Sequence, residues 1–509
     1  MRRFALISLV LLLAAARAAG QSNAALLSSP GQEAGSDASL SFRKDNGALI
    51  PLEGSDDAWQ ITASTESCQR VSERLVFHGK MAYTHFRGLH MGGPILMNPA
   101  GSPINFLEED FTARGTKKRE TYSLSGGLAY TLSRVVSLGM AADYTSADQV
   151  KYKDPRFKNV WMDLSLRPGI LLNLGESFAL GVNLEYRRTL EKISAGRYGT
   201  IERDFYILVD QGNYYGQRER FEGDVGYISL SNERPLENTY YGLAVQAVGG
   251  RNTRLSGQLT ALYRTGYFGT RSSSSVVFCE FKGPEIAFEG SLTRASGSNL
   301  HKVEANAFFG LVSNYTNSYR YDTQVGMTAT VVYLGQSKSF TKNDVDARLS
   351  YTFQGGTGGY LPKWEVKAAA GMAGKFYTTT VYPFRRDRTS VAVDATVSLG
   401  RNFSAGKNIW SCAVQGAFLT GFGEPRADSM AGGGTTTLRS FDNYSDRQFE
   451  YETAARAGAG LGLQYSRLIS ARLIPYIKIS DQFLLLLSAP RYLDGAARNV
   501  ALIGIGLHF

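Results

Sequence analysis

The chain has 509 residues, of which 43% are hydrophobic, 20% charged and 12% aromatic, and its formal net charge is +10. This composition is too apolar and aromatic for a disordered chain, and the mean hydropathy of −0.18 excludes a bundle of membrane helices. Three cysteines are too few for a disulfide framework, while the 55 glycines and 28 tyrosines are typical of a β-rich protein.

The first 20 residues have the features of a secretory signal peptide. Arg2 and Arg3 precede an apolar core over residues 4–16, which is too short to span a bilayer as a helix. Ala18 and Gly20 are small residues suited to cleavage before Gln21. We therefore expect an exported protein that loses residues 1–20.

Residues 21–55 form a polar segment rich in Ser, Gly and Asp, with one short strand candidate at 38–42. We expect this segment to precede a single barrel domain over residues 56–509. A segment of this length is too short for the globular plug of TonB-dependent transporters, so we expect a different class of protein.

From residue 56 onward, apolar and polar residues alternate in segment after segment. Successive side chains of a strand point to opposite faces, so each such segment has one apolar face and one face of small and charged residues. The apolar faces often end in Tyr or Phe, as an interfacial aromatic girdle requires. A soluble β-sandwich or propeller would also alternate. The clearest segments are 75–84, 122–132, 136–144, 160–167, 178–187, 345–353 and 391–399.

The C-terminal strand favours a membrane barrel over a soluble fold. Ile503, Ile505, Leu507 and Phe509 share one face, and the terminal residue is aromatic. This pattern resembles the barrel-closing strand that the barrel assembly machinery of bacterial outer membranes reads. We therefore predict an all-β protein, a transmembrane antiparallel up-and-down β-barrel of about 14–18 strands in the lipid of the bacterial outer membrane.

The connectors between strand candidates differ in length. Short turns at 133–134 and 175–176 are expected to face the periplasm. Long connectors are expected to face outward, and we place them at 86–118, 145–158, 190–238 and 421–451.

The most distinctive connector runs from residue 86 to residue 110. Six large apolar side chains within it should pack onto something, because exposing them to water is unfavourable. We expect the loop to pack over its neighbours outside the pore; a constriction in the barrel mouth or lumen is the alternative. The apolar residues are Ile95, Leu96, Met97, Ile104, Phe106 and Leu107.

Three motifs carry a resemblance to a known family: 91–94 (MGGP), 103–108 (PINFLE) and 154–161 (DPRFKNVW). With them the chain resembles a family of Bacteroidetes-type outer-membrane β-barrels of unassigned function. The resemblance implies the barrel fold and the outer membrane. It carries over no catalytic residues and leaves the ligand open.

The sequence gives little support for an enzyme. Among five histidines, His90 with Asp110 is the one loop-borne pair that could serve an outer-membrane hydrolase, and a solvated loop histidine is the simpler interpretation. His85, His90 and Met91 lack a diagnostic metal-site spacing. We expect no catalytic residues, no metal and no cofactor. Positive charge is dispersed among acids, so we also expect no nucleic-acid partner.

The lumen is the remaining functional surface. Its charges would either pair into a lattice that seals the barrel or line a polar pathway for small solutes. We predict a non-enzymatic channel or binding barrel for small solutes, with an accessory role beside an uptake or secretion system. The alternative is a structural or docking barrel with a closed lumen that binds an envelope partner protein. The predicted lumen-lining residues are Lys80, Asp143, Asp163, Arg167, Glu185, Arg187, Asp346, Arg348 and Asp394.

Overall fold

The structure is a computed structural model. It describes residues 23–28, 35–109, 113–175, 177–196, 204–221, 227–228, 234–323, 329–357, 361–431, 438–470 and 473–509. The expected signal peptide at 1–20 lies outside the described residues.

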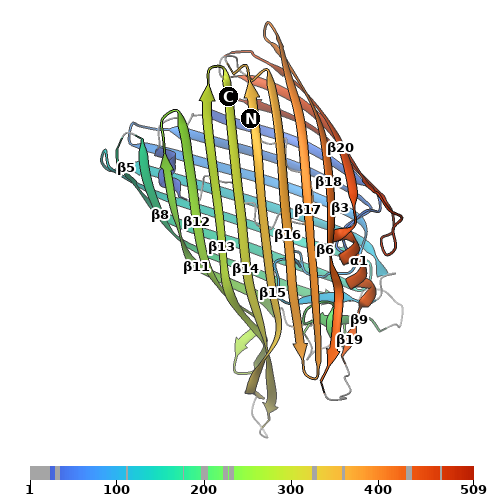
Figure 1. The fold of residues 1–509 in the computed structure, drawn as a ribbon. Helices are drawn as coiled ribbons and strands as arrows, with labels where there is room; N and C mark the ends of the chain where they lie inside the picture. Colours follow the sequence, from blue (N-terminus) through green and yellow to red (C-terminus); the bar gives the residue numbers. More distant parts are fainter. Residues whose placement is uncertain are drawn as a thin grey trace.

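Among the described residues, eighteen strands pair side by side into one closed antiparallel ring. Each strand pairs with the next ring strand in chain order, and the last pairs with the first (Figure 1). The prediction of an all-β, up-and-down barrel of about 14–18 strands is confirmed. The ring strands are β1 (Gly35–Asn46), β2 (Asp57–Arg70), β3 (Leu75–Met91), β5 (Gly115–Thr131), β6 (Val136–Tyr152), β7 (Arg156–Asn173), β8 (Phe178–Gly196), β11 (Arg234–Gly249), β12 (Thr253–Ser272), β13 (Ser275–Ser296), β14 (Asn299–Asp322), β15 (Thr330–Gly355), β16 (Trp364–Val381), β17 (Phe384–Ala405), β18 (Asn408–Met430), β20 (Arg456–Arg467), β21 (Ile474–Leu486) and β22 (Ala497–His508).

Strand β22 closes the ring between β21 and β1. Ile503 lies opposite Phe42 of β1, and Ile505 lies opposite Leu40. These side chains are exposed on the outside of the ring, as is the terminal Phe509. A closed ring pairs every strand edge, which the interior of a bilayer requires because lipid offers no hydrogen-bond partners.

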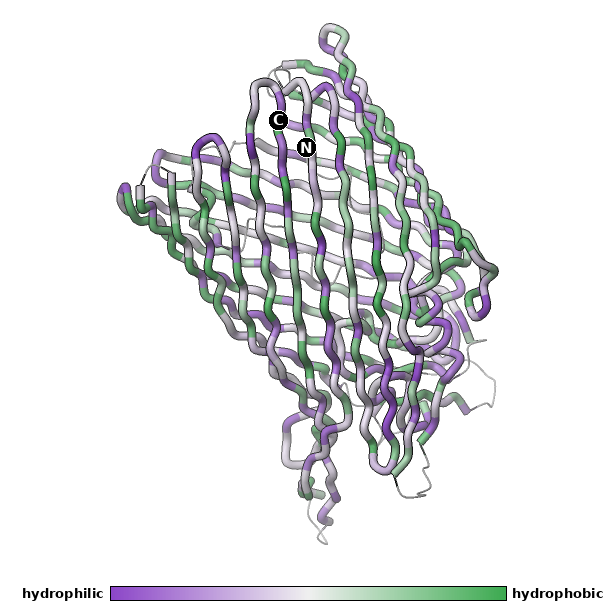
Figure 2. The backbone as a smooth tube through the Cα atoms, in the orientation of Figure 1, coloured by the Kyte–Doolittle hydropathy of each residue, from purple (hydrophilic) through white to green (hydrophobic). Residues whose placement is uncertain are grey.

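The outside of the ring is apolar. Hydrophobic and hydrophilic residues alternate along the strands (Figure 2), and many of the large hydrophobic side chains are exposed. Leu349 and Val397, for example, are each 57% exposed in the middle of long strands. An apolar belt on this scale is stable only against lipid. The protein is therefore a membrane barrel of the bacterial outer membrane.

The two ends of the barrel differ. The end that carries the C-terminus has short connectors, such as 132–135 between β5 and β6 and Gly406-Lys407 between β17 and β18. The opposite end carries the connectors after β3, β8 and β18, together with helix α1 (Asp442–Thr453) and strands β9 and β19 (Figure 1). Outer-membrane barrels keep short turns on the periplasmic side, so we place the longer connectors outside.

Two boundaries differ from the sequence-based expectation. The barrel begins at β1, within the segment 21–55 that we expected to precede it, because β1 is needed to pair with both β2 and β22. The connector expected at 145–158 is mostly strand: β6 and β7 stay paired up to Val150 and Lys158, and only residues 153–155 separate the two strands. Antiparallel strands can continue beyond the membrane as a paired hairpin, where polar residues on both faces hide the alternation.

Helix α1 has 12 residues. In the part of the chain that the structure describes, no helix is long and apolar enough to cross a membrane.

The apolar belt generates a first prediction. Val397→Arg places a charge on the lipid face of β17 and should lower the free energy of unfolding in lipid vesicles by about 2–4 kcal/mol. Thr396→Arg, one residue away on the inner face, should cost much less. Equal costs in a urea titration of the two variants would contradict the assignment of faces.

Candidate functional site

The outer mouth of the barrel contains a second, small sheet. It consists of β4 (Asn105–Glu108), β9 (Tyr206–Asp210), β10 (Tyr215–Arg220) and β19 (Arg439–Ser440), in the order β19-β10-β9-β4. These strands come from the connectors after β3, β8 and β18. We call this sheet, helix α1 and residues 92–104 the mouth cap.

Strands β4 and β9 of the cap sheet are apolar and buried on both faces, whereas β10 and β19 carry mostly polar residues. Phe106, Ile207 and Val209 lie in a cluster with side chains of the barrel wall, including Phe157 of β7 and Phe278 of β13. The alternate residues of the same strands face the other way, toward helix α1 and the first connector: Leu107, Leu208, Tyr444 and Leu52 form a second cluster. Strands buried on both faces are fixed elements of the fold and not loops that lie on the surface.

The loop 94–101 crosses the barrel interior. On one side, Lys117 of β5 donates a hydrogen bond to the Pro94 carbonyl oxygen (2.9 Å). On the other side, Arg264 of β12 donates to the Gly101 carbonyl oxygen (2.9 Å), and Lys342 of β15 donates to the carbonyl oxygen of Ala100.

Strands β5 and β15 are almost opposite one another in the ring of eighteen. The expectation that this loop packs outside the pore is therefore wrong, and the alternative, a constriction in the mouth, is the observed arrangement. The physical reason is the width of the barrel: its wall side chains leave room that the apolar residues of the loop fill.

Buried polar groups hold the cap to the wall. Lys151 of β6 forms an ion pair with Glu108 of the cap, and both side chains are almost completely buried, at 0% and 1% exposure. Glu191 of β8 accepts hydrogen bonds from the Met97 backbone amide (2.8 Å) and from Asn159 (2.6 Å). Groups of this kind are stable in a dry environment only when they are paired, so each one fixes the position of the cap.

Helix α1 is anchored to the opposite wall by Glu452. Its carboxylate accepts from Lys375 of β16 (2.6 Å), Arg388 of β17 (2.8 Å) and Ser390 (2.8 Å). Burial by itself would raise the pKa of this carboxyl, but Arg388 and Lys375 hold the pKa down to about 2. The helix is therefore tied to the wall by a charged group that stays ionised at neutral pH.

The pKa of a carboxyl on the cap sheet is shifted in the opposite direction, upward. Burial raises the pKa of Asp210 to about 6, although it accepts hydrogen bonds from the backbone amides of Gly212 (2.9 Å) and Tyr215 (3.3 Å). Its role is to hold the turn between β9 and β10.

Below the cap, the nine residues predicted to line the lumen lie on the wall face opposite the exposed apolar belt. Six of them pair with one another: Arg167 with Asp143 and Arg187 with Asp163 (2.6 Å) across neighbouring strands, and Arg348 of β15 with Asp394 of β17 (3.2 Å) across the intervening strand β16.

The other three predicted lumen residues have different surroundings. Lys80 pairs with Glu66 of β2 (3.0 Å), an acid that the sequence reasoning missed. Glu185 is buried, and Asp346 interacts electrostatically with Asp344 and Lys375.

Water reaches this lower level of the lumen. The side chains of Glu66, Asp143 and Arg348 keep 42%, 38% and 41% of their surface exposed although they face inward. At the level of the cap, by contrast, inward-facing Lys151 and Asn159 are fully buried. The lumen is thus divided into a dry outer level and a hydrated inner level.

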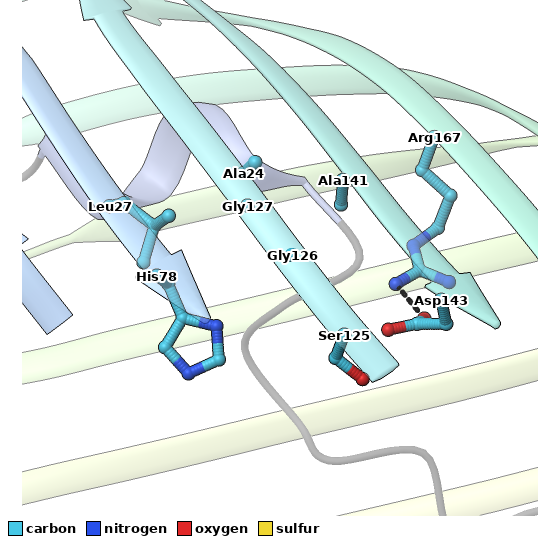
Figure 3. Close-up of a pocket in the computed structure, with 9 residues that line it drawn as sticks. All are labelled: Ala24, Leu27, His78, Ser125, Gly126, Gly127, Ala141, Asp143 and Arg167. Atoms are coloured by element: carbon cyan, nitrogen blue, oxygen red, sulfur yellow. Dashed lines mark hydrogen bonds and ion pairs between the residues drawn. The ribbon is translucent and has the colours of Figure 1, made fainter. Parts of the chain in front are cut away.

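A short N-terminal segment lies inside the lumen near its periplasmic end. The 3-10 helix η1 (Ala24–Ser28) packs on β5, β6 and β7, beside a cavity of about 10 Å³ lined by Leu27, His78, Asp143 and Arg167 (Figure 3). The wall beneath it is built from glycines: side chains added at Gly139 or Gly169 would collide with residues 23–25.

The side chain of Asn23 holds this N-terminal segment against the barrel wall through hydrogen bonds. Its amide donates to the carbonyl oxygen of Ile170 (3.1 Å) and to Gln246 (3.0 Å), and its side-chain oxygen accepts from the Ala25 amide (3.0 Å). Sequence reasoning did not find this contact, because the glycines that make room for it align only once four strands are in register.

Those of the candidate catalytic and metal residues that the structure describes do not come together in a site. His90 is 2.9 Å from Asp56 in an exposed ion pair, while its expected partner Asp110 lies outside the described residues. His78 is 3.2 Å from Glu66. Within the described ranges, no group of three or more His, Cys, Asp or Glu side chains is placed to hold a metal ion, and no disulfide joins Cys68, Cys279 and Cys412.

Comparison with known proteins identifies a family. The model of a family of unknown function (DUF6850) matches residues 24–509. No curated protein is significantly similar to the sequence.

Solved structures are similar only at a low level. The ferric preacinetobactin receptor BauA of Acinetobacter baumannii has a TM-score of 0.40 and 8% identity, covering 94% of this chain and 80% of the receptor. The outer membrane transporter YddB of Escherichia coli has a TM-score of 0.40 and 7% identity, covering 93% and 81%. At TM-scores below 0.5, these likenesses say nothing about what this chain binds.

The buried ion pair of the cap predicts a large effect of a single substitution. Lys151→Met leaves Glu108 charged and buried without its main partner, and should lower the free energy of unfolding by about 3–5 kcal/mol. The double variant Lys151→Met/Glu108→Leu should recover most of this loss, because no charge is left buried. Urea titrations of both variants check this; a double variant as unstable as the single one would contradict it.

The Glu452 anchor predicts a dependence on pH. Its folded-state pKa of about 2 lies below the ordinary value of 4.5, so its contribution is complete above pH 4.5 and is lost as the pH falls through about 2. The shift corresponds to about 3 kcal/mol. Glu452→Gln should therefore destabilise the protein at pH 7, and the difference from the wild type should shrink steadily below pH 4.5 in urea titrations.

Glu450→Gln provides the matched control. Glu450 is a neighbour on the same helix, and its carboxylate accepts described hydrogen bonds only from the backbone amides of 491–493. A loss for Glu452→Gln that is the same at pH 7 and pH 2.5 would show that the charge of Glu452 does not anchor the helix.

Proposed function

We propose a function for this chain, which belongs to the family of unknown function DUF6850, from the division of its lumen into a dry mouth and a hydrated interior. The protein is a non-enzymatic outer-membrane barrel that admits small solutes to a charged, water-filled lumen, and the mouth cap sets the size limit for entry from outside. It binds or passes solutes and acts beside a separate uptake or secretion system.

The observation that carries this proposal is the exposure of inward-facing charges below the cap. Paired but hydrated charges such as Asp143 with Arg167 and Arg348 with Asp394 leave a polar surface in contact with water. A solute that carries charges or hydroxyl groups can exchange its hydration for contacts with such a wall at little cost.

The second candidate function is a closed docking barrel that binds an envelope partner protein. The observation in its favour is the rigidity of the mouth cap, which is held by two apolar clusters and by the buried pair of Lys151 and Glu108. In that case the lumen admits water from the periplasm only, and nothing crosses the cap.

Single-channel recording separates the two functions. The purified barrel in planar bilayers should show small, steady conductance steps, and replacing residues 95–104 by a short Gly-Ser linker should raise the conductance several-fold, because this loop crosses the mouth. Lys302→Met, which removes an inward-facing charge paired with Glu304, is the matched control and should leave the step size nearly unchanged. Silence of the wild type together with large steps of the loop variant would favour the docking barrel.

A further inference from the structure

The lipid side of the barrel wall carries a belt of aromatic side chains near the periplasmic end. Trp364 of β16, Phe403 of β17 and Trp410 of β18 are 39%, 47% and 54% exposed. Trp410 packs on Tyr465 of β20, with the ring centres 4.5 Å apart. Exposed aromatic rings on a membrane barrel lie at the level of the lipid headgroups. This belt therefore marks the end of the hydrocarbon region on the periplasmic side.

Arg401 of β17 lies within this belt and faces the lipid. It is exposed, and it shares one face of the strand with Val397 and Leu399, which belong to the apolar outside of the ring. The apolar stretch 391–399 has the length that a strand needs to cross the hydrocarbon, about 9–11 residues. Arg401 therefore comes directly after the hydrocarbon level, where the headgroups begin.

Two aromatic rings hold the guanidinium group of Arg401 in place. Its guanidinium carbon lies 4.3 Å from the centre of the Trp364 ring and 4.8 Å from the centre of the Phe403 ring. The strand register explains the first contact, because Trp364 lies directly opposite Arg401. Arginine stacks on aromatic rings through its flat face, so this contact orients the side chain without using its N–H donors.

The lipid face around Arg401 lacks acidic side chains among the described residues. A single acid, Glu365, occurs at the periplasmic ends of β16, β17, β18 and β20, which comprise residues 361–367, 398–414 and 460–470. Glu365 follows the outward-facing Trp364 and so faces the lumen, where Gln354 donates a hydrogen bond to it (2.8 Å). Within the described part of the chain, Arg401 forms neither an ion pair nor a hydrogen bond through its side chain.

The turns at this end add further positive charge. Lys363 and Lys407 are both exposed there. The carbonyl oxygen of Lys363 accepts a hydrogen bond from the backbone amide of Asn402 (3.0 Å), which places the turn before β16 beside the strand position next to Arg401. The periplasmic rim over β16 and β17 is therefore a positively charged surface.

An arginine on the lipid face at the other end of the barrel is paired within the protein. Arg188 lies on the same face of β8 as the exposed Leu184, and its guanidinium group is 2.8 Å from the carboxylate of Glu237 on β11. The chain thus supplies its own carboxylate to Arg188 at the outer end and none to Arg401 at the periplasmic end.

The membrane itself contains the group that Arg401 lacks. An unpaired charge is unfavourable near the hydrocarbon and is tolerated where it meets water or a counter-ion. The phosphate of a phospholipid lies at the level of the aromatic belt, and two of its oxygens match the guanidinium fork. The acyl chains of the same lipid would lie along the apolar stretch 391–399.

We propose that Arg401, held between Trp364 and Phe403, binds the phosphate group of an anionic phospholipid in the inner leaflet of the outer membrane. The positive charges of Lys363 and Lys407 favour an anionic headgroup over a zwitterionic one. The site goes beyond the proposed function, because it lies on the outside of the barrel and does not depend on what the lumen admits.

The experiment measures lipid binding by native mass spectrometry of the purified full chain in detergent. The barrel is titrated with dioleoyl phosphatidylglycerol, and in separate arms with dioleoyl phosphatidylcholine and with sodium phosphate. We expect saturable binding of phosphatidylglycerol, weaker binding of phosphatidylcholine and no saturable binding of inorganic phosphate, because the acyl chains contribute to binding. Arg401→Gln should weaken the binding of phosphatidylglycerol about fivefold, since one arginine near a lipid surface contributes about 1 kcal/mol.

Two further variants accompany Arg401→Gln. Trp364→Leu keeps the charge and removes one of the rings that orient it; it serves where Arg401→Gln does not fold, and should weaken binding about two- to fivefold. Arg188→Gln is the matched control, because it also removes an arginine from the lipid face, but one that Glu237 already pairs with. This control should bind phosphatidylglycerol like the wild type.

Three results would overturn the site: equal binding of the two lipids by the wild type, wild-type affinity in the folded Arg401→Gln and Trp364→Leu variants, or an equal loss in Arg188→Gln. Saturable binding of inorganic phosphate that matches the binding of phosphatidylglycerol would overturn the lipid as the ligand. Silence in planar bilayers would count against solute passage and would leave this site in place.

Discussion

The requirement that every backbone N–H and C=O group in the bilayer be paired within the protein governs this structure. An open sheet would leave two edges unpaired in lipid, so the first and last ring strands must meet. They do so where β1 pairs with β22, with Phe42 opposite Ile503. Closure thus brings the first and last ring strands together. It also determines which face of every strand is turned to the lipid and which to the lumen. Side chains alternate between lipid and lumen, and the large apolar residues can lie only outside.

Closure of eighteen strands also creates a space that the wall side chains cannot fill. The chain fills its outer end with its own connectors: β4, β9, β10 and β19 form a sheet, of which β4 and β9 are apolar and buried on both faces. The inner end stays hydrated. The same kinds of charged residue therefore have two roles. Lys151 and Glu108 form a dry pair that fixes the cap, whereas Arg348 and Asp394 form a wet pair that lines the interior.

Helix α1 ties the cap to the wall. Glu452 is held by Arg388 of β17 and Lys375 of β16, and Tyr451 lies over Arg456 of β20.

The sequence by itself determined the fold class and the location, because the alternation of side chains is a local property that survives without knowledge of strand pairing. Segments such as 345–353 and the terminal residues 501–509 were sufficient for this. The sequence also indicated that the apolar residues of the connector 86–110 must pack onto something. Only the tertiary structure decided where, because the contacts of Pro94 with Lys117 and of Gly101 with Arg264 join residues far apart in the chain. The contacts of Asn23 with β7, β8 and β11 depend in the same way on the register across neighbouring strands, which alternation within one strand does not specify. The same holds for the pairing of His90 with Asp56.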